Sequence, residues 1–522
     1  MTFRYLSLLT TFFIFATICW SSIRRVPDDY PTISSAISNC DRGDTIILGL
    51  GTYTEPITLS SSITIASLYL LSHDSTAIHQ TNWQASNNRV ITAQNCTLRV
   101  AGLKFTPIIP SYNSGVMIAT NSYVAFDNCR IENVFDSIQG VPRGLIYTSD
   151  VDSKLSIDKT VFQHDNIGNV HSIYARGKLT VTRSSFFNRE QSRDADFAIF
   201  ARDSLFIENC LFDHRGPGLS IGNNFVVSNS VFRRLGCYAI EPASARMTYG
   251  LFTNCQFDSL IADDSYQIIS LSANQALVEF RDCEFNGTNE NTGGFAMFRC
   301  ASPVFFKRCK IQSISGVSVL IRGNNVHVDS CIFSNNLSPL FSKNSAEANV
   351  LSITNTDYYN NSTFDTTPMG SSRIDTANAI NCYWGHASGP HHVLNPDGAG
   401  MNLNNYVNPF PFRTTPVFPE NGIGEPGNVT YSLPNSIELL PAYPNPFNSS
   451  VTIRFRLPQP GDATVAIYDL TGREVATLYR GNLPVATPQR ILWQPQQLAS
   501  GTFFVQLQSG SEVSVKRINY LR

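Results

Sequence analysis

Three charged residues occupy the same position in successive copies of a repeated phrase and could act together on an acidic substrate. They are Arg281, Lys307 and Asp329, and Glu279 and His327 lie two residues before two of them. A lyase that acts on uronic acids needs a cation to bind the carboxylate and a base to remove the neighbouring proton. Arg281, Lys307 and Asp329 are therefore the candidate catalytic residues. The simpler interpretation is that these charges are solvated and pair with one another on an exposed sheet.

Two aspartates, Asp127 and Asp158, share that position in two other consecutive copies. Adjacent carboxylates can form an acid/base pair or a seat for Ca²⁺. Nothing else in the sequence supports calcium, and solvated carboxylates paired across neighbouring copies are the simpler interpretation. We expect no cofactor.

A histidine-rich segment is the remaining candidate for metal binding. His386, His391, His392 and Asp397 could form a site, but a polar capping loop is the simpler interpretation. No pair of cysteines has the close spacing of a zinc site. We expect no bound metal.

The charged candidates belong to a phrase that recurs through the middle of the chain. Its clearest copies read LFIENCLF, VEFRDCEF and VHVDSCIF, and successive copies are 20 to 31 residues apart. A period in this range indicates a repeat architecture. One small residue or cysteine marks each copy, and these markers are Leu103, Cys129, Thr160, Ser184, Cys210, Ser230, Cys255, Cys283, Cys309, Cys331 and Thr356.

Each copy predicts two short strands joined by a tight corner. In LFIENCLF, Leu205 and Ile207 have the period of a strand with one buried face. The alternation slips by one residue at Asn209 and resumes at Cys210 and Phe212. Because such a slip would reverse the buried face, the chain must bend there. The copies then form coils of a parallel β-helix, about a dozen of them stacked at roughly 4.8 Å.

Equivalent residues of successive copies form columns, so packing explains most of the phrase. The corner column contains amide and carboxylate side chains that can hydrogen-bond along the stack and that tolerate a left-handed backbone. It includes Asn209, Asn229, Asn254 and Asp282. A second column is almost entirely aromatic. It reads Phe105, Ile131, Phe162, Phe186, Phe212, Phe232, Phe257, Phe285, Ile311, Phe333 and Tyr358.

Seven of the 12 cysteines lie on or near the marker column. Neighbouring side chains of such a column point the same way about 4.8 Å apart, which is longer than a disulfide prefers. Cysteine also packs as a small hydrophobe. We therefore expect a ladder of free thiols at Cys129, Cys210, Cys255, Cys283, Cys309, Cys331 and Cys382.

Composition and the N-terminus indicate an exported protein. A net charge of −2 and 15% charged residues give no reason to expect nucleic acid as a partner. Residues 1–22 are predicted to be a signal peptide, with Arg4 before an apolar stretch at Leu6–Ile18. No other segment is long and apolar enough for a transmembrane anchor.

The two ends of the repeat region carry a family resemblance. Ile33, Ala36, Ile37 and Cys40 have helical spacing after Thr32, which predicts a helix that caps the first coil. This start, with Gly-Thr-Tyr at 51–53 and the closing Trp-Gly turn at 384–385, resembles the right-handed parallel β-helix family of NosD-like and pectin-lyase-like proteins. The resemblance implies an all-β, right-handed parallel β-helix over residues 23–410.

The last part of the chain differs in composition and carries a second resemblance. Prolines are dense in a predicted linker at 411–440, and alternating strands with glycine turns predict a small β-sandwich at 441–522. This segment resembles the C-terminal sorting domain of type IX secretion. The resemblance implies export to the cell surface and the secretion machinery as a partner. Its motif residues here are Pro444, Asn445, Pro446, Phe447, Gly472 and Gly501.

The sequence is compatible with two function classes. The favoured one is a monomeric, non-catalytic surface rod that binds glycans or other surface partners or serves as a structural element. The other is a polysaccharide lyase or glycoside hydrolase that acts on acidic polysaccharide. The β-helix fold alone does not decide between them.

Overall fold

The structure is a computed structural model of the 522-residue chain. It describes residues 21–84, 89–107, 115–133, 144–164, 171–188, 197–214, 218–234, 240–242, 249–260, 269–271, 277–287, 298–300, 303–313, 321–323, 325–336, 341–343, 350–361, 377–403, 407–418, 437–439, 442, 445, 447–448, 451–457, 461–483, 489–495, 498–510 and 512–521. The predicted signal peptide lies outside the described residues up to residue 20.

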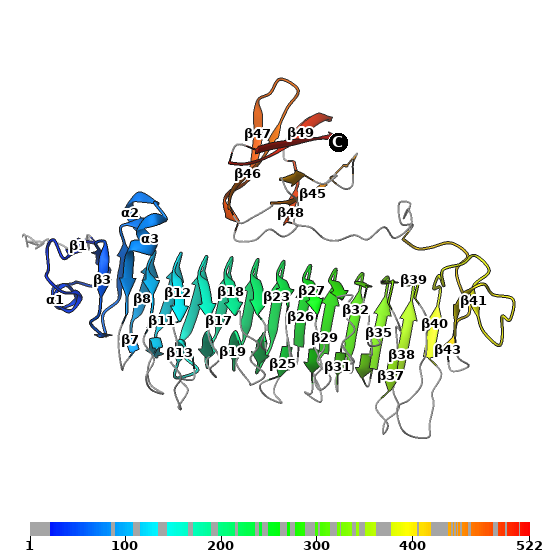
Figure 1. Cartoon of the computed structure of the whole chain (residues 1–522), viewed down its shortest axis with the longest axis horizontal. Coiled ribbons are helices and arrows are strands. Elements are labelled where there is room, and N and C mark those ends of the chain that lie inside the picture. The colour runs from blue at the N-terminus through cyan, green and yellow to red at the C-terminus, as the bar shows by residue number, and fades with distance from the viewer. Residues whose placement is uncertain are drawn as a thin grey trace, which may run out of the picture. The chain divides into compact units, whose positions relative to one another are not determined.

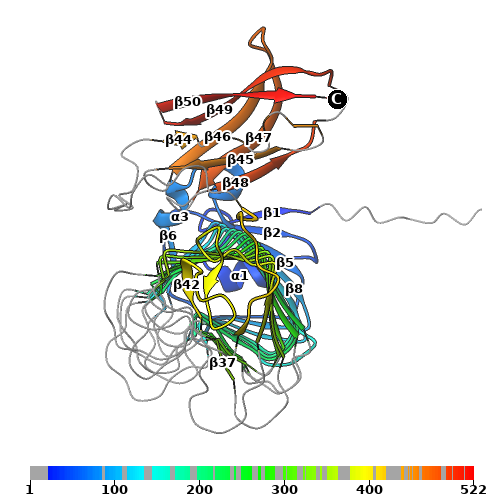
Figure 2. The same cartoon turned by 90° about the vertical axis from the view of Figure 1, so that its right-hand side faces the viewer.

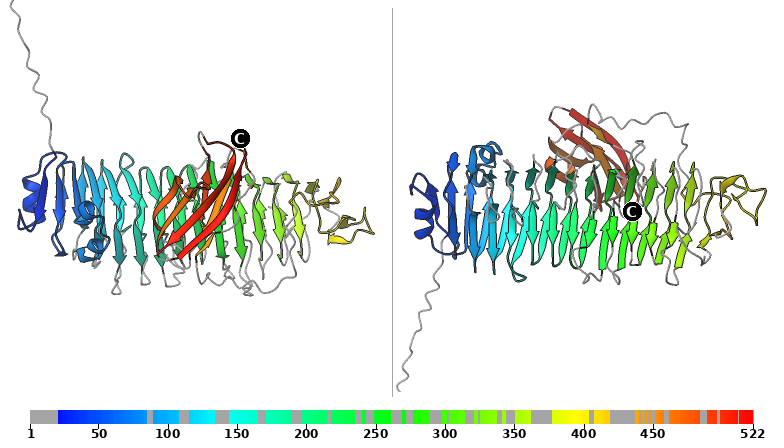
Figure 3. Two further views of the ribbon diagram at one scale, coloured as in Figure 1. Left: turned by 90° about the horizontal axis from the view of Figure 1, so that it is seen from above. Right: turned by 60° about the horizontal axis from the view of Figure 1, so that its bottom comes forward.

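The chain divides into two compact units, Met1–Phe418 and Pro419–Arg522. The first unit is a rod of stacked coils whose three parallel sheets run along its length (Figure 1). Seen along the rod axis, the sheets form three sides around a common interior (Figure 2). The further views in Figure 3 show the strands of one coil lying beside those of the next along the rod. The predicted all-β, parallel β-helix is confirmed.

Sheet A contains 16 strands, each hydrogen-bonded to the equivalent strand of the next coil. In spatial order they are β1 (Ile23–Val26), β2 (Thr45–Leu48), β5 (Ile63–Ser67), β8 (Thr97–Ala101), β11 (Tyr123–Asp127), β14 (Lys154–Asp158), β17 (Leu179–Thr182), β20 (Leu205–Glu208), β23 (Phe225–Ser228), β26 (Tyr249–Thr253), β29 (Leu277–Arg281), β32 (Val304–Lys307), β35 (Asn325–Asp329), β38 (Val350–Thr354), β40 (Ala377–Ile380) and β43 (Val407–Asn408).

Sheet B contains 13 strands. They are β3 (Gly51–Tyr53), β6 (Thr81–Trp83), β9 (Lys104–Phe105), β12 (Arg130–Asn133), β15 (Val161–His164), β18 (Ser185–Asn188), β21 (Leu211–His214), β24 (Val231–Arg233), β27 (Gln256–Leu260), β30 (Glu284–Gly287), β33 (Lys310–Gln312), β36 (Ile332–Ser334) and β39 (Asp357–Tyr359).

Sheet C contains 12 strands, so about a dozen coils carry one strand in each sheet. They are β4 (Ile57–Leu59), β7 (Arg89–Gln94), β10 (Gly115–Thr120), β13 (Ile146–Thr148), β16 (Ile173–Ala175), β19 (Ile199–Ala201), β22 (Leu219–Ile221), β25 (Ile240–Pro242), β28 (Ile269–Leu271), β31 (Phe298–Cys300), β34 (Ile321–Gly323) and β37 (Phe341–Lys343).

The predicted corner between sheets A and B is present and left-handed. Asn209, Asn229, Asn254 and Asp282 have φ values between 50° and 55°. Asn and Asp tolerate this conformation better than most residues with a Cβ. One step of the predicted amide ladder is a hydrogen bond of 2.6 Å from Asn254 Nδ2 to Asn229 Oδ1.

The aromatic column fills the interior, as predicted. Ring centroids of successive members lie between 4.7 and 4.9 Å apart, with interplanar angles of 1° to 9°. That spacing equals the separation of neighbouring strands, so each ring packs on the equivalent ring of the next coil. These rings belong to Phe162, Phe186, Phe212, Phe232, Phe257 and Phe285.

The cysteine column consists of free thiols. All seven predicted members are free and buried. Their sulfurs lie within hydrogen-bonding reach of backbone carbonyls, as for Cys210 with the carbonyl of Val181 at 3.5 Å. Burial raises the pKa of the thiols of Cys129, Cys210 and Cys382 to about 12. These thiols are therefore unreactive in the folded rod, and their side chains serve to pack the core.

A helix covers the first coil. α1 (Ile33–Ser38) starts at Thr32, whose side chain accepts a hydrogen bond from the Ser35 amide in a capping box. Ile33 and Ala36 are buried in the rod core. This cap removes an open sheet end that would otherwise invite edge-to-edge pairing. Two further short helices, α2 (Tyr69–Ser72) and α3 (Thr76–Gln80), follow β5.

The last coils are closed by a loop region and a returning segment. Within the loops lies a two-stranded sheet of β41 (Pro390–His391) and β42 (Gly400–Asn402). Residues 411–418 then pack back on the rod, where the buried Asp357 carboxylate accepts the amides of Val417 and Phe418 at 3.0 and 2.8 Å. The chain therefore leaves the rod at a fixed point on sheet B.

The second unit contains two antiparallel sheets with one shared core. Phe447, Trp493 and Ile518 are among the buried residues of that core. One sheet has the order β44 (Glu438–Leu439), β45 (Val451–Arg456) and β48 (Gln489–Trp493), and the other has the order β47 (Glu474–Leu483), β46 (Gly461–Tyr468), β49 (Gly501–Ser509) and β50 (Glu512–Tyr520).

Candidate functional site

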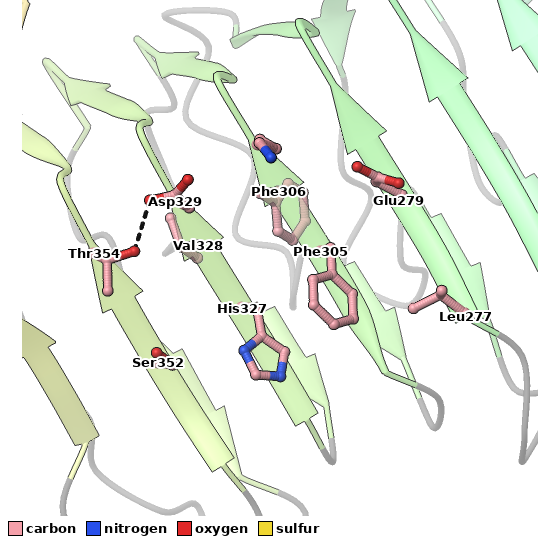
Figure 4. Close-up of a pocket in the computed structure, with 10 residues that line it drawn as sticks. Leu277, Glu279, Phe305, Phe306, His327, Val328, Asp329, Ser352 and Thr354 are labelled. Atoms are coloured by element: carbon pink, nitrogen blue, oxygen red, sulfur yellow. Dashed lines mark hydrogen bonds between the residues drawn. The ribbon is translucent and has the colours of Figure 1, made fainter.

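A groove of about 370 Å³ opens on the outer face of sheet A (Figure 4). It crosses four neighbouring strands, β29, β32, β35 and β38, which pair in parallel. The residues that line it are Leu277, Glu279, Phe305, Phe306, Lys307, His327, Val328, Asp329, Ser352 and Thr354.

Strand periodicity directs these side chains to the outer face. On β32, Val304 and Phe306 are buried in the core, whereas Phe305 is half-buried and Lys307 is exposed. Successive side chains of a strand point to opposite faces, so each of these strands has two outward residues that lie two positions apart. The equivalent outward residues of neighbouring strands then form two columns. The structure therefore uses the same alternation to build the core and the groove.

The strand register aligns the outer residues into two rows along the rod. One row is Glu279, Phe305, His327 and Ser352. The second row is Arg281, Lys307, Asp329 and Thr354. The predicted stacking of Arg281, Lys307 and Asp329 in consecutive coils is thus present in the strand register.

Lys307 is the available cation of the groove. Its side chain is exposed, and its ammonium makes no ion pair with any residue that the structure describes. Asp329 is its register partner on the next strand. A strongly hydrated, mobile ammonium at such a position suits the binding of an anionic group.

Both carboxylates of the groove are engaged by the protein. Asp329 Oδ1 accepts hydrogen bonds from Thr354 Oγ1 at 2.7 Å and from Asn355 Nδ2 at 3.0 Å. Partial burial tends to raise the pKa of Asp329, but these hydrogen bonds and the Lys307 charge outweigh it and leave that pKa below its ordinary value. Glu279 Oε1 accepts from Arg281 Nε at 3.0 Å and Nη2 at 2.8 Å.

An aromatic pair lies between the charged residues. Phe305 and His327 have ring centroids 4.4 Å apart and an interplanar angle of 13°, and Figure 4 shows the two rings side by side on the outer face. Desolvation by partial burial lowers the pKa of His327. The imidazole is therefore uncharged near neutral pH and packs as part of an apolar surface.

The structure brings the predicted cluster together with one difference. Lys307, Asp329, Glu279 and His327 all line the groove, whereas Arg281 does not line it and is turned to Glu279. Phe305 was not predicted as a groove residue. The sequence contained a signal for it, because this aromatic residue occupies the same outer column as Glu279 and His327.

The two aspartates of the other predicted pair are each held by an arginine. Asp127 accepts from Arg99 Nη2 at 2.8 Å, and Asp158 forms an ion pair with Arg183. The two carboxylates are neighbours in the register of β11 and β14. Their arrangement is that of charges that pair across coils.

The histidine-rich loop does not gather its residues into one site. His386, His391 and Asp397 are exposed, whereas His392 is buried and accepts a hydrogen bond from the Leu394 amide. Over the described residues as a whole, no group of three or more His, Cys, Asp or Glu side chains is placed to hold a metal ion.

Four of the six residues assigned to the sorting motif lie among the described residues of the second unit. The Asn445 carboxamide donates to the Arg517 carbonyl at 3.1 Å and accepts the Asn519 amide at 2.8 Å. Phe447 is buried, and its ring lies 5.2 Å from that of Tyr520. Pro444 and Pro446 lie outside the described residues. Gly472, at φ +81°, forms the turn between β46 and β47, and Gly501 begins β49.

Comparison with known families agrees with both parts of this architecture. Residues 114–290 match the right-handed beta helix region, and residues 441–519 match the secretion system C-terminal sorting domain. The chain is a right-handed β-helix protein with a type IX secretion sorting domain. This exported rod is a secreted or outer-membrane surface protein, and its sorting domain interacts with the secretion machinery.

The comparison with solved structures gives only matches of low sequence identity and low TM-score. A mannuronic acid specific polysaccharide family 6 lyase from human gut microbiota is 12% identical over 74% of this chain and 83% of its own, with a TM-score of 0.37. The family 6 alginate lyase AlyGC is 9% identical over 77% and 90%, with a TM-score of 0.18. These TM-scores are too low to support an argument about function.

No curated protein matches the sequence. Across the described residues, none of the helices is long and apolar enough to cross a membrane.

Proposed function

We propose that this protein is an exported, non-catalytic rod that binds an acidic glycan at the cell surface through the groove on sheet A. The observation that carries the proposal is the Lys307 ammonium, exposed beside the stacked Phe305–His327 pair. An apolar and aromatic lining with a few placed polar groups is typical of small-ligand sites. The cation supplies the contact for a sugar carboxylate.

The state of the two groove carboxylates favours binding over chemistry. A general base needs a free carboxylate or imidazole with a pKa near the working pH. Asp329 is held by two hydrogen bonds and has a lowered pKa, and Glu279 is held by Arg281. Such carboxylates position neighbouring groups and accept hydroxyl hydrogen bonds, but they are poor proton acceptors.

A binding measurement on soluble polysaccharides tests the proposal. The full-length protein is titrated calorimetrically with a polyuronate and with the same polymer after reduction of its carboxyl groups. We expect the acidic polymer to bind, and Lys307→Met to weaken it about tenfold by removing one charge-assisted hydrogen bond.

Lys154→Met is the matched control, because Lys154 is also exposed on the outer face of sheet A but lies outside the groove lining. An equal loss in both variants, or no binding of any polysaccharide, would contradict the proposal.

A second candidate function is a polysaccharide lyase. The observation in its favour is that the uncharged His327 imidazole shares the groove with Lys307. In that reaction Lys307 would hold the uronate carboxylate, and His327 would take the proton from the adjacent carbon. The electron pair of that C–H bond would form the carbon–carbon double bond as the glycosidic bond breaks, and water would give a proton to the departing sugar oxygen. The product has a carbon–carbon double bond, so its ultraviolet absorbance distinguishes a lyase from a binding protein. Release of this product by the wild type, and its loss in His327→Ala, would support catalysis.

A further inference from the structure

Glu279 and Arg281 form a pair within one strand at the edge of the groove. They are two residues apart on β29, so both side chains lie on the outer face. The Arg281 Nε and Nη2 groups both donate to the same Glu279 oxygen. This Nε–Nη2 side is one of the edges with which a guanidinium grips a carboxylate in bidentate fashion. It is occupied from within the protein.

The next strand also has a cation at the second position, but the carboxylate at the first position is replaced by an aromatic ring. Phe305 is the register partner of Glu279, and Lys307 is the register partner of Arg281. Lys307 therefore has an aromatic ring where Arg281 has a carboxylate. Of these two cations, only Lys307 lines the groove, and its own strand has no carboxylate two residues before it.

We propose that Glu279 is an internal competitor that occupies the Arg281 guanidinium and thereby limits how tightly the groove binds carboxylates. This inference rests on the proposed function of the groove as an acidic-glycan site. Glu279 and not Lys307 is then the residue that sets affinity and selectivity for charge, because it decides whether one cation or two face the ligand.

The competition follows from the tether between the two residues. A carboxylate on the same strand is present at a high effective concentration, so a ligand carboxylate must displace it to reach Arg281. The Glu279 side chain is 17% exposed and that of Arg281 is 40% exposed, so solvent and ligand can reach the pair. Loss of the Glu279 charge would free Arg281 one coil from Lys307, where both cations can hold one anionic ligand.

The test is a double-mutant cycle read as binding of a polyuronate to the full-length protein. We expect Glu279→Gln to raise the affinity about tenfold, the gain of one charge-assisted contact. Arg281→Met should weaken binding by the wild type, because it leaves the Glu279 carboxylate of the groove lining unpaired against an anionic ligand. The same change in the Glu279→Gln background should remove the gain. Glu279→Thr, a residue that suits a strand, repeats the measurement without an amide.

Asp282→Asn is the matched control. It also removes one negative charge beside the groove, from the ion pair with Arg308, but neither residue lines the groove. A gain as large in Asp282→Asn would show a general charge effect and overturn the inference. If the wild type binds the polyuronate and both Glu279 variants bind it equally well or more weakly, the inference is also overturned. Absence of binding in every protein would instead refute the proposed function.

Discussion

The outer face of sheet A differs between its N-terminal coils and the groove, although both are built on the same rows of the same sheet. In the N-terminal coils Asp127 and Asp158 are each paired with an arginine. In the groove Lys307 stands beside Phe305. The same sheet thus carries paired charges in one region and a cation available to a ligand in another. The fold supplies the rows, and single residues decide what they recognise.

The largest expected effect tests whether the two regions share one interior. Phe186 lies in an N-terminal coil and Phe285 lies in a coil of the groove, and both are fully buried. Each change to Ala should lower the free energy of unfolding by about 3–5 kcal/mol, because it removes a packed ring and leaves a cavity. Urea unfolding measures both variants. A much smaller loss at Phe285 would mean that the regions differ inside as well as outside.

The next effect converts the groove into the N-terminal type of surface. Phe305→Glu places a carboxylate beside Lys307 in the arrangement that Glu279 has with Arg281. We expect about tenfold weaker binding of an acidic polysaccharide, since the ammonium would be neutralised from within. Calorimetric titration measures the change. Val226→Glu, in the same row but outside the groove lining, should bind like the wild type.

The interior could be predicted from the sequence, since a column needs only a residue type and a period. Phe212 and Cys210 could be assigned because the phrase repeats in phase, and packing leaves few alternatives for a large ring at that position. The left-handed corner at Asn209 followed from the slip in the alternation. These features depend on backbone register, which the repeat determines.

The groove could be predicted only in part, because its properties depend on side-chain direction. The sequence indicated that Lys307 and Asp329 stack, but it gave no means to know that Arg281 turns to Glu279. The alternation places Phe305 on the outer face, in the column of Glu279 and His327, but it does not indicate that the ring stacks on His327. Partners two residues apart and half-buried rings are decided by rotamers and neighbouring coils.

A smaller effect concerns the pH dependence of the groove. The pKa of Asp329 is lower in the folded protein than its ordinary value. Its ionised form therefore contributes stability above the unfolded-state pKa, and this contribution is lost as the pH falls through the folded-state pKa. We expect Asp329→Asn to cost about 1 kcal/mol at neutral pH and progressively less in acid, with Thr354→Val as a partial mimic. Urea unfolding across pH measures it; a constant difference would refute the assignment.

The smallest effect is expected in the N-terminal coils. The ion pair of Arg183 and Asp158 is partly exposed, at 55% and 22% of the two side chains. A double-mutant cycle with alanine should give a coupling of about 0.5 kcal/mol that shrinks with added salt. Polysaccharide binding should not change. A change in binding would show that ligands use this region too, and the contrast between the two surfaces would then fail.

The column of buried thiols has a consequence for the route by which the protein reaches the surface. Of the nine cysteines that the structure describes as free, eight are buried, and an oxidant cannot reach them once the coils have stacked. Any disulfide between two of these eight buried cysteines in protein isolated from the cell surface must therefore have formed before stacking. Mass spectrometry of alkylated thiols would then date the folding of the rod relative to its passage through an oxidising compartment.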